Sequence, residues 1–166
     1  DFLVRNNPDI ANTLLDLAYT AGAILLGLVA LKRVAQCPPK LGTYEVGFQL
    51  GPRLNAAGRL ETAEESLRLL LAANETEALP IAQALDMHNR ERQKIERNIV
   101  EEVSGAVRAR FNPQTDFVIV EGHVSWHIGV VGIVASRVLQ QFYRPAIILG
   151  GDGEQFRGSG RSIPAF

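Results

Sequence analysis

The 166-residue chain contains few of the residues that build cysteine-based sites. Its single cysteine, Cys37, excludes an internal disulfide and a zinc site made of cysteines, so a reducing, cytoplasmic setting is expected. There is no P-loop, no Gly-x-Ser-x-Gly nucleophile motif and no clustered Asp/His metal set. We therefore expect this chain to hold no catalytic residues and no metal ligands of its own.

Neither sign of charge dominates the chain. Lys and Arg number 17 against 18 Asp and Glu, and residues 1–74, 75–111 and 112–166 are each nearly neutral. Binding nucleic acid through bulk charge requires clustered cations, so any such binding must depend on a few placed groups. Fourteen of the cations are arginine, which suits bidentate phosphate contacts, although an arginine-biased genome explains the same excess.

A membrane-length apolar run is also lacking. The best candidate, Leu14 to Leu31, contains Asp16 and Thr20 and is too short and polar to span a bilayer. No basic region precedes it, so a signal peptide is not expected either. The pattern instead predicts a buried helix that begins near Leu14 and continues through residues 24–34.

The next helical signals are two capping boxes. Thr62 with Glu65 predicts the start of one helix, and Asn74 with Glu77 predicts the start of another. The second helix is expected from about residue 75 to residue 110, since no glycine or proline lies between Ile81 and Ser104.

This long helix has two different halves. Its C-terminal half carries an apolar stripe at helical spacing, whereas Met87 is the only apolar residue from Asp86 to Lys94. A helix that is polar on every face has no core to pack into, so we expect an exposed bridge between domains. The alternative is a surface helix held by ion pairs such as Arg92/Glu96.

The last third of the chain predicts a βαβ unit. Residues 117–120 form a continuous apolar run typical of a strand buried on both faces, residues 129–142 are helical, and residues 145–149 form a second buried strand. This spacing predicts a parallel pair with a right-handed crossover. A glycine-rich turn then leads into a third strand over residues 155–163.

The third strand carries the most specific polar pattern. Alternation places Arg157, Ser159 and Arg161 on one face, and Gly158 and Gly160 on the other, which would be bare. A hydroxyl between two guanidinium groups is a suitable seat for a phosphate. A flexible Gly/Ser linker or a plain sheet edge explains the same residues equally well.

Two further segments are candidate binding loops. Trp126 and His127 follow the first strand, where α/β sheets bind ligands, and they could stack on a base or contact a phosphate. A metal site there is disfavoured, because no third ligand is near. Arg53, Asn55 and Arg59 lie among small residues that let a nucleic-acid strand approach closely, but glycine and proline also mark ordinary loops.

Three segments together resemble the RecJ family, single-strand-specific DNA 5′-exonucleases of the DHH phosphoesterase superfamily. The resemblance covers roughly residues 45–166. It is carried by FQLGPRLNAAGRL (48–60), WHIGVVGIVASR (126–137) and GSGRS (158–162), in that order, with NRER (89–92) between the first two.

This resemblance implies an α/β fragment of a two-domain enzyme. Residues 1–74 would be the C-terminal, helical remnant of a DHH domain, 75–111 a connector helix, and 112–166 the N-terminal part of a DHHA1 domain with a βαβ core. The Asp-His-His motif and its companion aspartates, which hold two Mn²⁺ or Mg²⁺ ions in the family, are absent from this sequence. The fragment is thus expected to bind no metal and to be inactive alone.

The resemblance also implies functional roles for individual residues. Ser159 and Arg161 would hold a 5′ phosphate, and Arg53, Asn55, Arg59 and His127 would lie beside the cleft. The full set of expected phosphate- or DNA-binding residues is Arg53, Asn55, Arg59, Trp126, His127, Arg137, Arg157, Ser159 and Arg161. The expected reaction is two-metal hydrolysis of single-stranded DNA from its 5′ end in recombination and repair. Its candidate protein partners are a single-strand-binding protein and a recombination helicase, and no membrane is involved.

Two other classes of function remain open. One is a related DHH phosphoesterase that acts on short oligonucleotides or cyclic dinucleotides. The other is a non-catalytic nucleic-acid-binding module. A preference for long single strands with a 5′ phosphate would distinguish the exonuclease from both.

Overall fold

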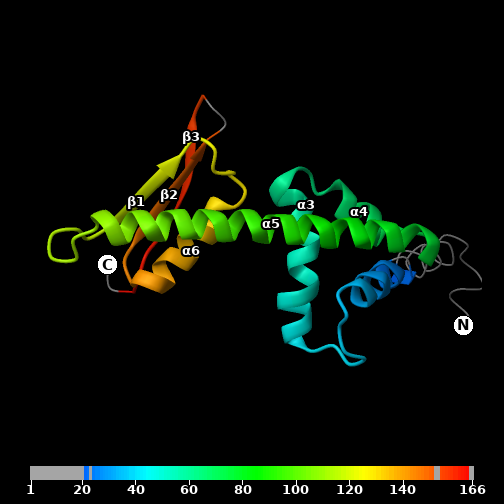
Figure 1. Cartoon of the computed structure of the whole chain (residues 1–166). Helices are drawn as coiled ribbons and strands as arrows, with labels where there is room; N and C mark the ends of the chain where they lie inside the picture. The colour runs from blue at the N-terminus through cyan, green and yellow to red at the C-terminus, as the bar shows by residue number, and fades with distance from the viewer. Residues whose placement is uncertain (1–20, 23, 152–153, 165–166) are drawn as a thin grey trace, which may run out of the picture. The chain divides into compact units, whose positions relative to one another are not determined.

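The computed structural model describes residues 21–22, 24–151 and 154–164. This part is a mixed α/β protein, with helices along most of the chain and one three-stranded sheet (Figure 1), which confirms the expected fold class. The chain divides into two compact units, Asp1–Asn89 and Arg90–Phe166. The predicted helix start near Leu14 lies outside the described residues. None of the helices described is long and apolar enough to cross a membrane.

The first unit is helical. Residues 24–34 form a helix. It is followed by a π-helix, η1 (Glu45–Leu50), and by the α-helices α3 (Gly51–Leu60), α4 (Glu64–Leu70) and the first part of α5 (Glu75–Arg110). Leu31, Leu69 and Leu85 are fully buried in its core. Gly27 permits close packing of residues 24–34 on α4, since a Cβ there would collide with the carbonyl oxygen of Leu69.

The segment around Gly51 and Pro52 is not a loop. It opens α3, and Pro52 sits in the first turn, where a helix does not need the backbone N–H that proline lacks. The residues that were candidates for a binding loop therefore lie on a rigid helix.

Helix α5 has the predicted bounds, Glu75–Arg110. Its capping box forms: Asn74 Oδ1 accepts the Glu77 backbone N–H at 2.9 Å, and Glu77 Oε2 accepts the N–H of Ala73 at 3.1 Å. The capping box at Thr62 does not form, because α4 begins at Glu64 with Ala63 at the N-cap and no side-chain cap.

The expectation that the middle of α5 is exposed on every face is wrong. One face is buried although it is polar, and its residues are 2–8% exposed: Asp86, Asn89, Arg92 and Glu96. Burial of charged groups is tolerated when they are paired, and the carboxylates of Asp86 and Glu96 both bind arginines. The predicted Arg92/Glu96 ion pair is confirmed, at 2.8 Å, but it is buried rather than on the surface.

The second unit contains the predicted βαβ arrangement. Strands β1 (Ile119–His123) and β2 (Ala146–Gly151) are parallel and are joined through α6 (Val131–Phe142). Strand β3 (Phe156–Arg161) pairs antiparallel with β2, so the sheet order is β1-β2-β3. Helix α6 packs on β2 and β3.

The expectation that the first strand is buried on both faces is wrong. The strand begins at Ile119 rather than Phe117, and alternation sends Ile119 and Ile148 into the core beside α6. Val120 and its partner Ile147 point the other way and are 56% and 40% exposed. One face of the sheet is thus open in the described part of the chain.

Candidate nucleic-acid interface

Arg157, Ser159 and Arg161 share one face of β3, as the alternation predicts. Their partners on β2 are Gly150, Ile148 and Ala146, and all three of these are buried. Because α6 packs on this side of the sheet, the polar face of β3 lies beside α6. Arg157 and Arg161 are exposed, and Ser159 is half-buried between them.

The polar face of β3 meets the first turn of α6 at Gly132. A Cβ at Gly132 would lie 3.4 Å from Ser159 Oγ and 3.6 Å from Arg161 Nη2. Arg161 Nε donates to Ser136 Oγ at 3.3 Å, and Ser136 Oγ in turn donates to the Gly132 carbonyl at 3.1 Å. We call Gly132, Ser136, Ser159 and Arg161 the α6/β3 seat. It joins two hydroxyls and an exposed guanidinium to a helix N-terminus, whose dipole favours an anion.

The two glycines of β3 have different surroundings on the face that they share. A Cβ at Gly158 would collide with the Leu149 side chain and lie 2.7 Å from the Ile148 carbonyl oxygen. At Gly160 the nearest atom would be Ile147 Cγ1, at 3.9 Å. Gly158 is therefore required by packing against Leu149, and only Gly160 borders open space.

The two candidate residues in the loop between β1 and α6 differ in burial and in hydrogen bonding. His127 is half-buried, and its Nδ1 accepts the Gly129 backbone N–H at 3.2 Å. Trp126 is 6% exposed, and its indole N–H donates to Glu102 Oε2 at 2.8 Å. The buried indole anchors the loop to α5 and leaves no exposed ring face on which a base could stack.

Arg137 projects from α6 and is held by α5. Its Nε forms an ion pair with Glu96 Oε1, while Arg92 donates to the other carboxylate oxygen of Glu96 at 2.8 Å. The Arg137 side chain remains 58% exposed, whereas that of Glu96 is 2% exposed. Glu96 therefore fixes the position of a solvent-facing arginine.

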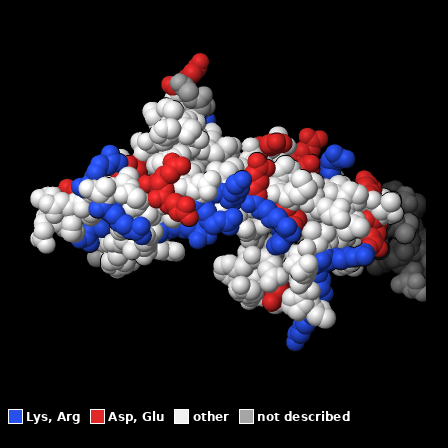
Figure 2. All heavy atoms as spheres, viewed as in Figure 1, with Lys and Arg blue, Asp and Glu red and all other residues white. Residues whose placement is uncertain are grey.

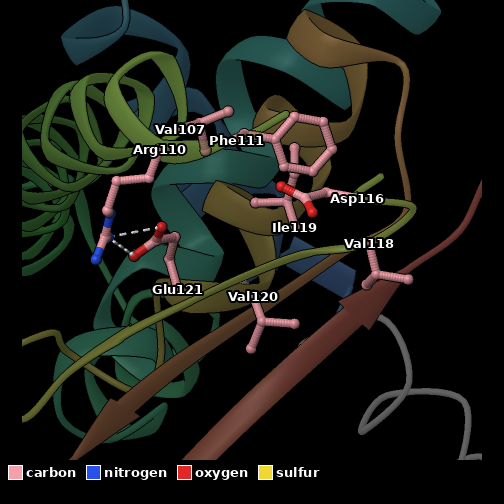
Figure 3. A pocket seen from close by; sticks show the side chains of 8 residues that line it. All are labelled: Val107, Arg110, Phe111, Asp116, Val118, Ile119, Val120 and Glu121. Atoms are coloured by element: carbon pink, nitrogen blue, oxygen red, sulfur yellow. Dashed lines mark hydrogen bonds and ion pairs between the residues drawn. The ribbon is translucent and has the colours of Figure 1, made fainter. Parts of the chain in front are cut away.

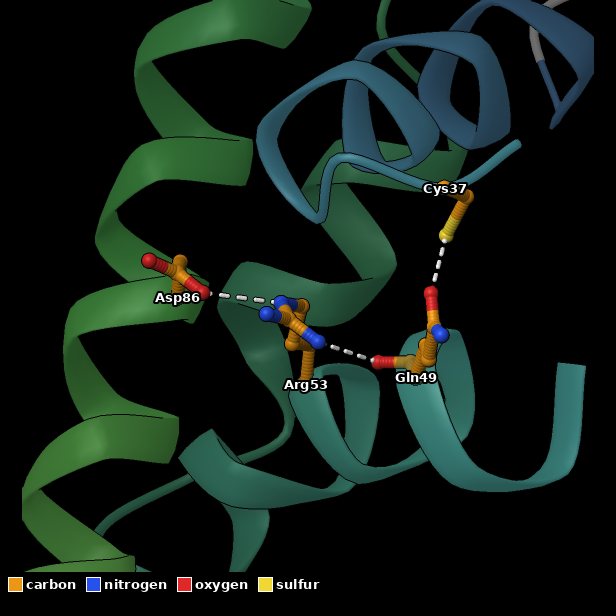
Figure 4. Close-up of polar contacts among 4 residues, drawn as sticks. All are labelled: Cys37, Gln49, Arg53 and Asp86. Atoms are coloured by element: carbon orange, nitrogen blue, oxygen red, sulfur yellow. Dashed lines mark hydrogen bonds and ion pairs between the residues drawn. The ribbon is translucent and has the colours of Figure 1, made fainter. Parts of the chain in front are cut away.

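The candidates on α3 also differ in exposure. The Arg53 side chain is 17% exposed, donates to Asp86 Oδ1 at 2.8 Å and to the Gln49 carbonyl at 2.7 Å (Figure 4). Asn55 and Arg59 are exposed and lie four residues apart on one face of α3. They line a shallow hollow of about 280 Å³ with Leu54, Gly58 and Ala63.

Charges of both signs are spread over the face shown in Figure 2, as the balanced composition predicts.

A second hollow, of about 300 Å³, lies beside β1 and is lined by Val107, Arg110, Phe111, Asp116 and residues 118–121 (Figure 3). Both Glu121 carboxylate oxygens accept bonds from Arg110 Nη2, at 2.9 and 2.8 Å. None of the expected site residues lines this hollow, and sequence reasoning gave no signal for it. Within the described residues, no three His, Cys, Asp or Glu side chains gather as potential metal ligands.

The chain is similar to RecJ exonucleases of several bacteria. No protein-family model matches the chain. It is 45% identical over 123 residues to the single-stranded-DNA-specific exonuclease RecJ of Bacillus subtilis, a match that covers 73% of this chain and 15% of that protein. It is 41% identical over 148 residues to RecJ of Escherichia coli, covering 86% of this chain and 26% of that protein.

Solved structures give the same result. The crystal structure of RecJ in complex with Mg²⁺ from Thermus thermophilus matches 90% of this chain and 23% of its own, with a TM-score of 0.73 and 33% identity. A structure of exonuclease RecJ bound to manganese matches 90% of this chain and 36% of its own, with a TM-score of 0.68 and 32% identity. The chain thus spans between 15 and 26% of the length of the curated relatives named above.

Proposed function

We propose that this chain, which is homologous to a segment of the RecJ single-stranded-DNA exonucleases, is the substrate-binding part of a metal-dependent 5′-to-3′ exonuclease acting in recombination and repair. The observation that carries the proposal is the α6/β3 seat, where Ser159 and Arg161 meet the N-terminal turn of α6. A terminal phosphate carries the charge and oxygen acceptors that such a seat binds.

Residues around the seat are proposed to bind the strand behind its end. Arg157 continues the same strand face, His127 lies in the loop before α6, and Arg137 is held solvent-facing by Glu96. In the first unit, exposed Asn55 and Arg59 are proposed to contact the DNA backbone and fix its register. Trp126 is buried, so we assign it to packing rather than to base stacking.

Domain limits and cellular setting form part of the same proposal. Residues 1–74 would end a DHH domain, 75–111 would connect it, and 112–166 would begin a DHHA1 domain. The setting would be the cytoplasm, with a single-strand-binding protein and a recombination helicase as partners.

Metal chemistry is not assigned to the described residues. RecJ has been crystallised with Mg²⁺ and with Mn²⁺, but no three potential ligands gather in the described parts of this chain. The described residues therefore do not fit a metal centre. What they supply is binding: Arg161 neutralises phosphate charge, the Ser159 hydroxyl orients the phosphate, and Ser136 holds Arg161 in place.

The proposal is tested with the full-length protein that contains this chain. Supplied with Mn²⁺ or Mg²⁺, it should shorten a 3′-labelled single strand from the 5′ end and leave a blunt duplex intact. Cleavage restricted to short oligonucleotides or cyclic dinucleotides would instead identify the related phosphoesterase. Strand binding without cleavage would identify a non-catalytic module.

A further inference from the structure

We infer that Asp86 of α5 is a positioning residue, which binds Arg53 and thereby fixes the orientation in which α3 presents Asn55 and Arg59. Arg53 then has a structural role in place of the direct DNA contact that its motif suggests. The consequence for DNA binding rests on the proposed function, whereas the Asp86–Arg53 coupling itself does not.

The first support is the geometry of the ion pair. Arg53 Nε donates to Asp86 Oδ1 at 2.8 Å, and the two side chains are 17% and 7% exposed. Figure 4 shows the Arg53 guanidinium between the α5 carboxylate on one side and the Gln49 carbonyl on the other. To reach a phosphate, Arg53 would have to leave a buried carboxylate, which is far more costly than leaving an exposed partner.

The second support is the backbone at the junction of η1 and α3. The π-helix hydrogen-bond pattern continues to Gly51, whose N–H donates to the Val46 carbonyl, and the next residue, Pro52, has no N–H. Arg53 supplies a side-chain donor to the Gln49 carbonyl at this point, at 2.7 Å. The Arg53 guanidinium, paired with Asp86, therefore ties the end of η1 to α5 directly beside a proline that donates no backbone hydrogen bond.

The third support is a contact to Gln49 from the opposite side. The Cys37 thiol donates to Gln49 Oε1 at 2.9 Å, which ties the loop after residues 24–34 to the same turn (Figure 4). Gln49 is thus held by Cys37 through its side chain and by Arg53 through its carbonyl. Asp86 anchors this chain of contacts to α5.

Helix α3 transmits the constraint to the proposed binding residues. Ala56 and Ala57 are buried against the core, at 0% and 3% exposure, whereas Asn55 and Arg59 on the same helix are exposed. Arg53, Asn55 and Arg59 all lie on α3. If losing the Arg53 contacts shifts this helix, Asn55 and Arg59 therefore move together.

The two roles predict opposite effects of Asp86→Asn in the full-length protein. If Arg53 touches DNA, removing its carboxylate partner releases it and binding of single-stranded DNA becomes tighter. If Asp86 positions α3, binding weakens by at least about tenfold, because the charged hydrogen bond that Arg59 is proposed to make to the DNA is lost. Glu75→Gln is the matched control, because it removes a carboxylate from the exposed Arg33–Glu75 pair, whose side chains are 68% and 61% exposed. Asp86→Asn binding that equals or exceeds that of Glu75→Gln would overturn the inference.

Two further measurements separate positioning from general damage. In a background that carries both Asn55→Ala and Arg59→Ala, Asp86→Asn should weaken binding less than twofold, because the contacts it orients are already gone; a full tenfold loss there would also overturn the inference. In thermal unfolding, Arg53→Ala combined with Asp86→Ala should lower Tm no further than the worse single variant, and additive losses would refute the coupling. Unfolding does not involve DNA, so a wild-type protein that fails to bind single strands would reject the proposed function while this coupling is still measured.

Discussion

Gly158 and Gly160 lie on the same face of β3 but have different neighbours. Gly158→Ala would place a methyl group against Leu149 and the Ile148 carbonyl, so β2 and β3 would have to shift. We expect it to destabilise the protein by about 1–3 kcal/mol, the usual cost of overpacking. Gly160→Ala, whose added methyl meets only Ile147 at 3.9 Å, is the matched control and should change stability little. Chemical denaturation of the two variants measures the difference, and equal stability would contradict this packing.

Alternation along the chain was enough to predict which residues of β3 share a face. It could not predict that Gly158 accommodates Leu149, because that contact depends on the register with β2. The same holds for Arg53, whose partner Asp86 is 33 residues away. The sequence indicates that these side chains are polar or small, but their roles depend on contacts made through the tertiary structure.

At the scale of elements, the N-terminus of α5 is defined by Asn74. Its side chain accepts the Glu77 N–H at 2.9 Å, so Asn74→Ala should cost about 1 kcal/mol of stability. Asn74→Asp keeps an acceptor at the N-cap and is expected to stay near wild type. Thermal unfolding of the two variants is the measurement, and a neutral Asn74→Ala would show that the cap does not stabilise α5.

The bounds of α5 followed from local signals, namely the capping box and the absence of glycine and proline. Its buried polar face did not, because hydrophobic periodicity treats paired charges as exposed. Asp86 and Glu96 are buried because arginines neutralise them: Arg53 and Arg137 come from distant parts of the sequence, and Arg92 pairs with Glu96 from one turn away. The Thr62 capping box matched the motif as well as the one at Asn74, and only the start of α4 at Glu64 rules it out.

At the scale of the whole molecule, the second unit presents a sheet with one covered face. The apolar run at the first strand predicted burial on both faces, but Val120 and Ile147 are 56% and 40% exposed. The sequence shows that Val120 and Ile147 are apolar, but it does not show whether another element covers their side of the sheet. The order of the βαβ elements, by contrast, follows from their spacing alone and was predicted correctly.

The isolated 166-residue chain should not degrade DNA. The described residues contain no group of potential metal ligands that would activate water, so purified chain with Mn²⁺ or Mg²⁺ should leave labelled single strands intact. Metal-dependent degradation that persists after a second purification and is lost in Arg161→Ala would contradict the expected inactivity of the isolated chain.

The α6/β3 seat is proposed to bind the 5′-terminal phosphate. The most direct test compares wild-type and Arg161→Ala full-length protein in equilibrium binding to two single strands that differ only in a 5′ phosphate or a 5′ hydroxyl. Arg108→Ala, which removes an exposed cation from α5, is the control for general charge. We expect Arg161→Ala to weaken binding of the phosphorylated strand by about 1.5–3 kcal/mol and of the hydroxyl strand much less. Equal losses on both strands would contradict it and leave Arg161 as an ordinary contact to the DNA backbone.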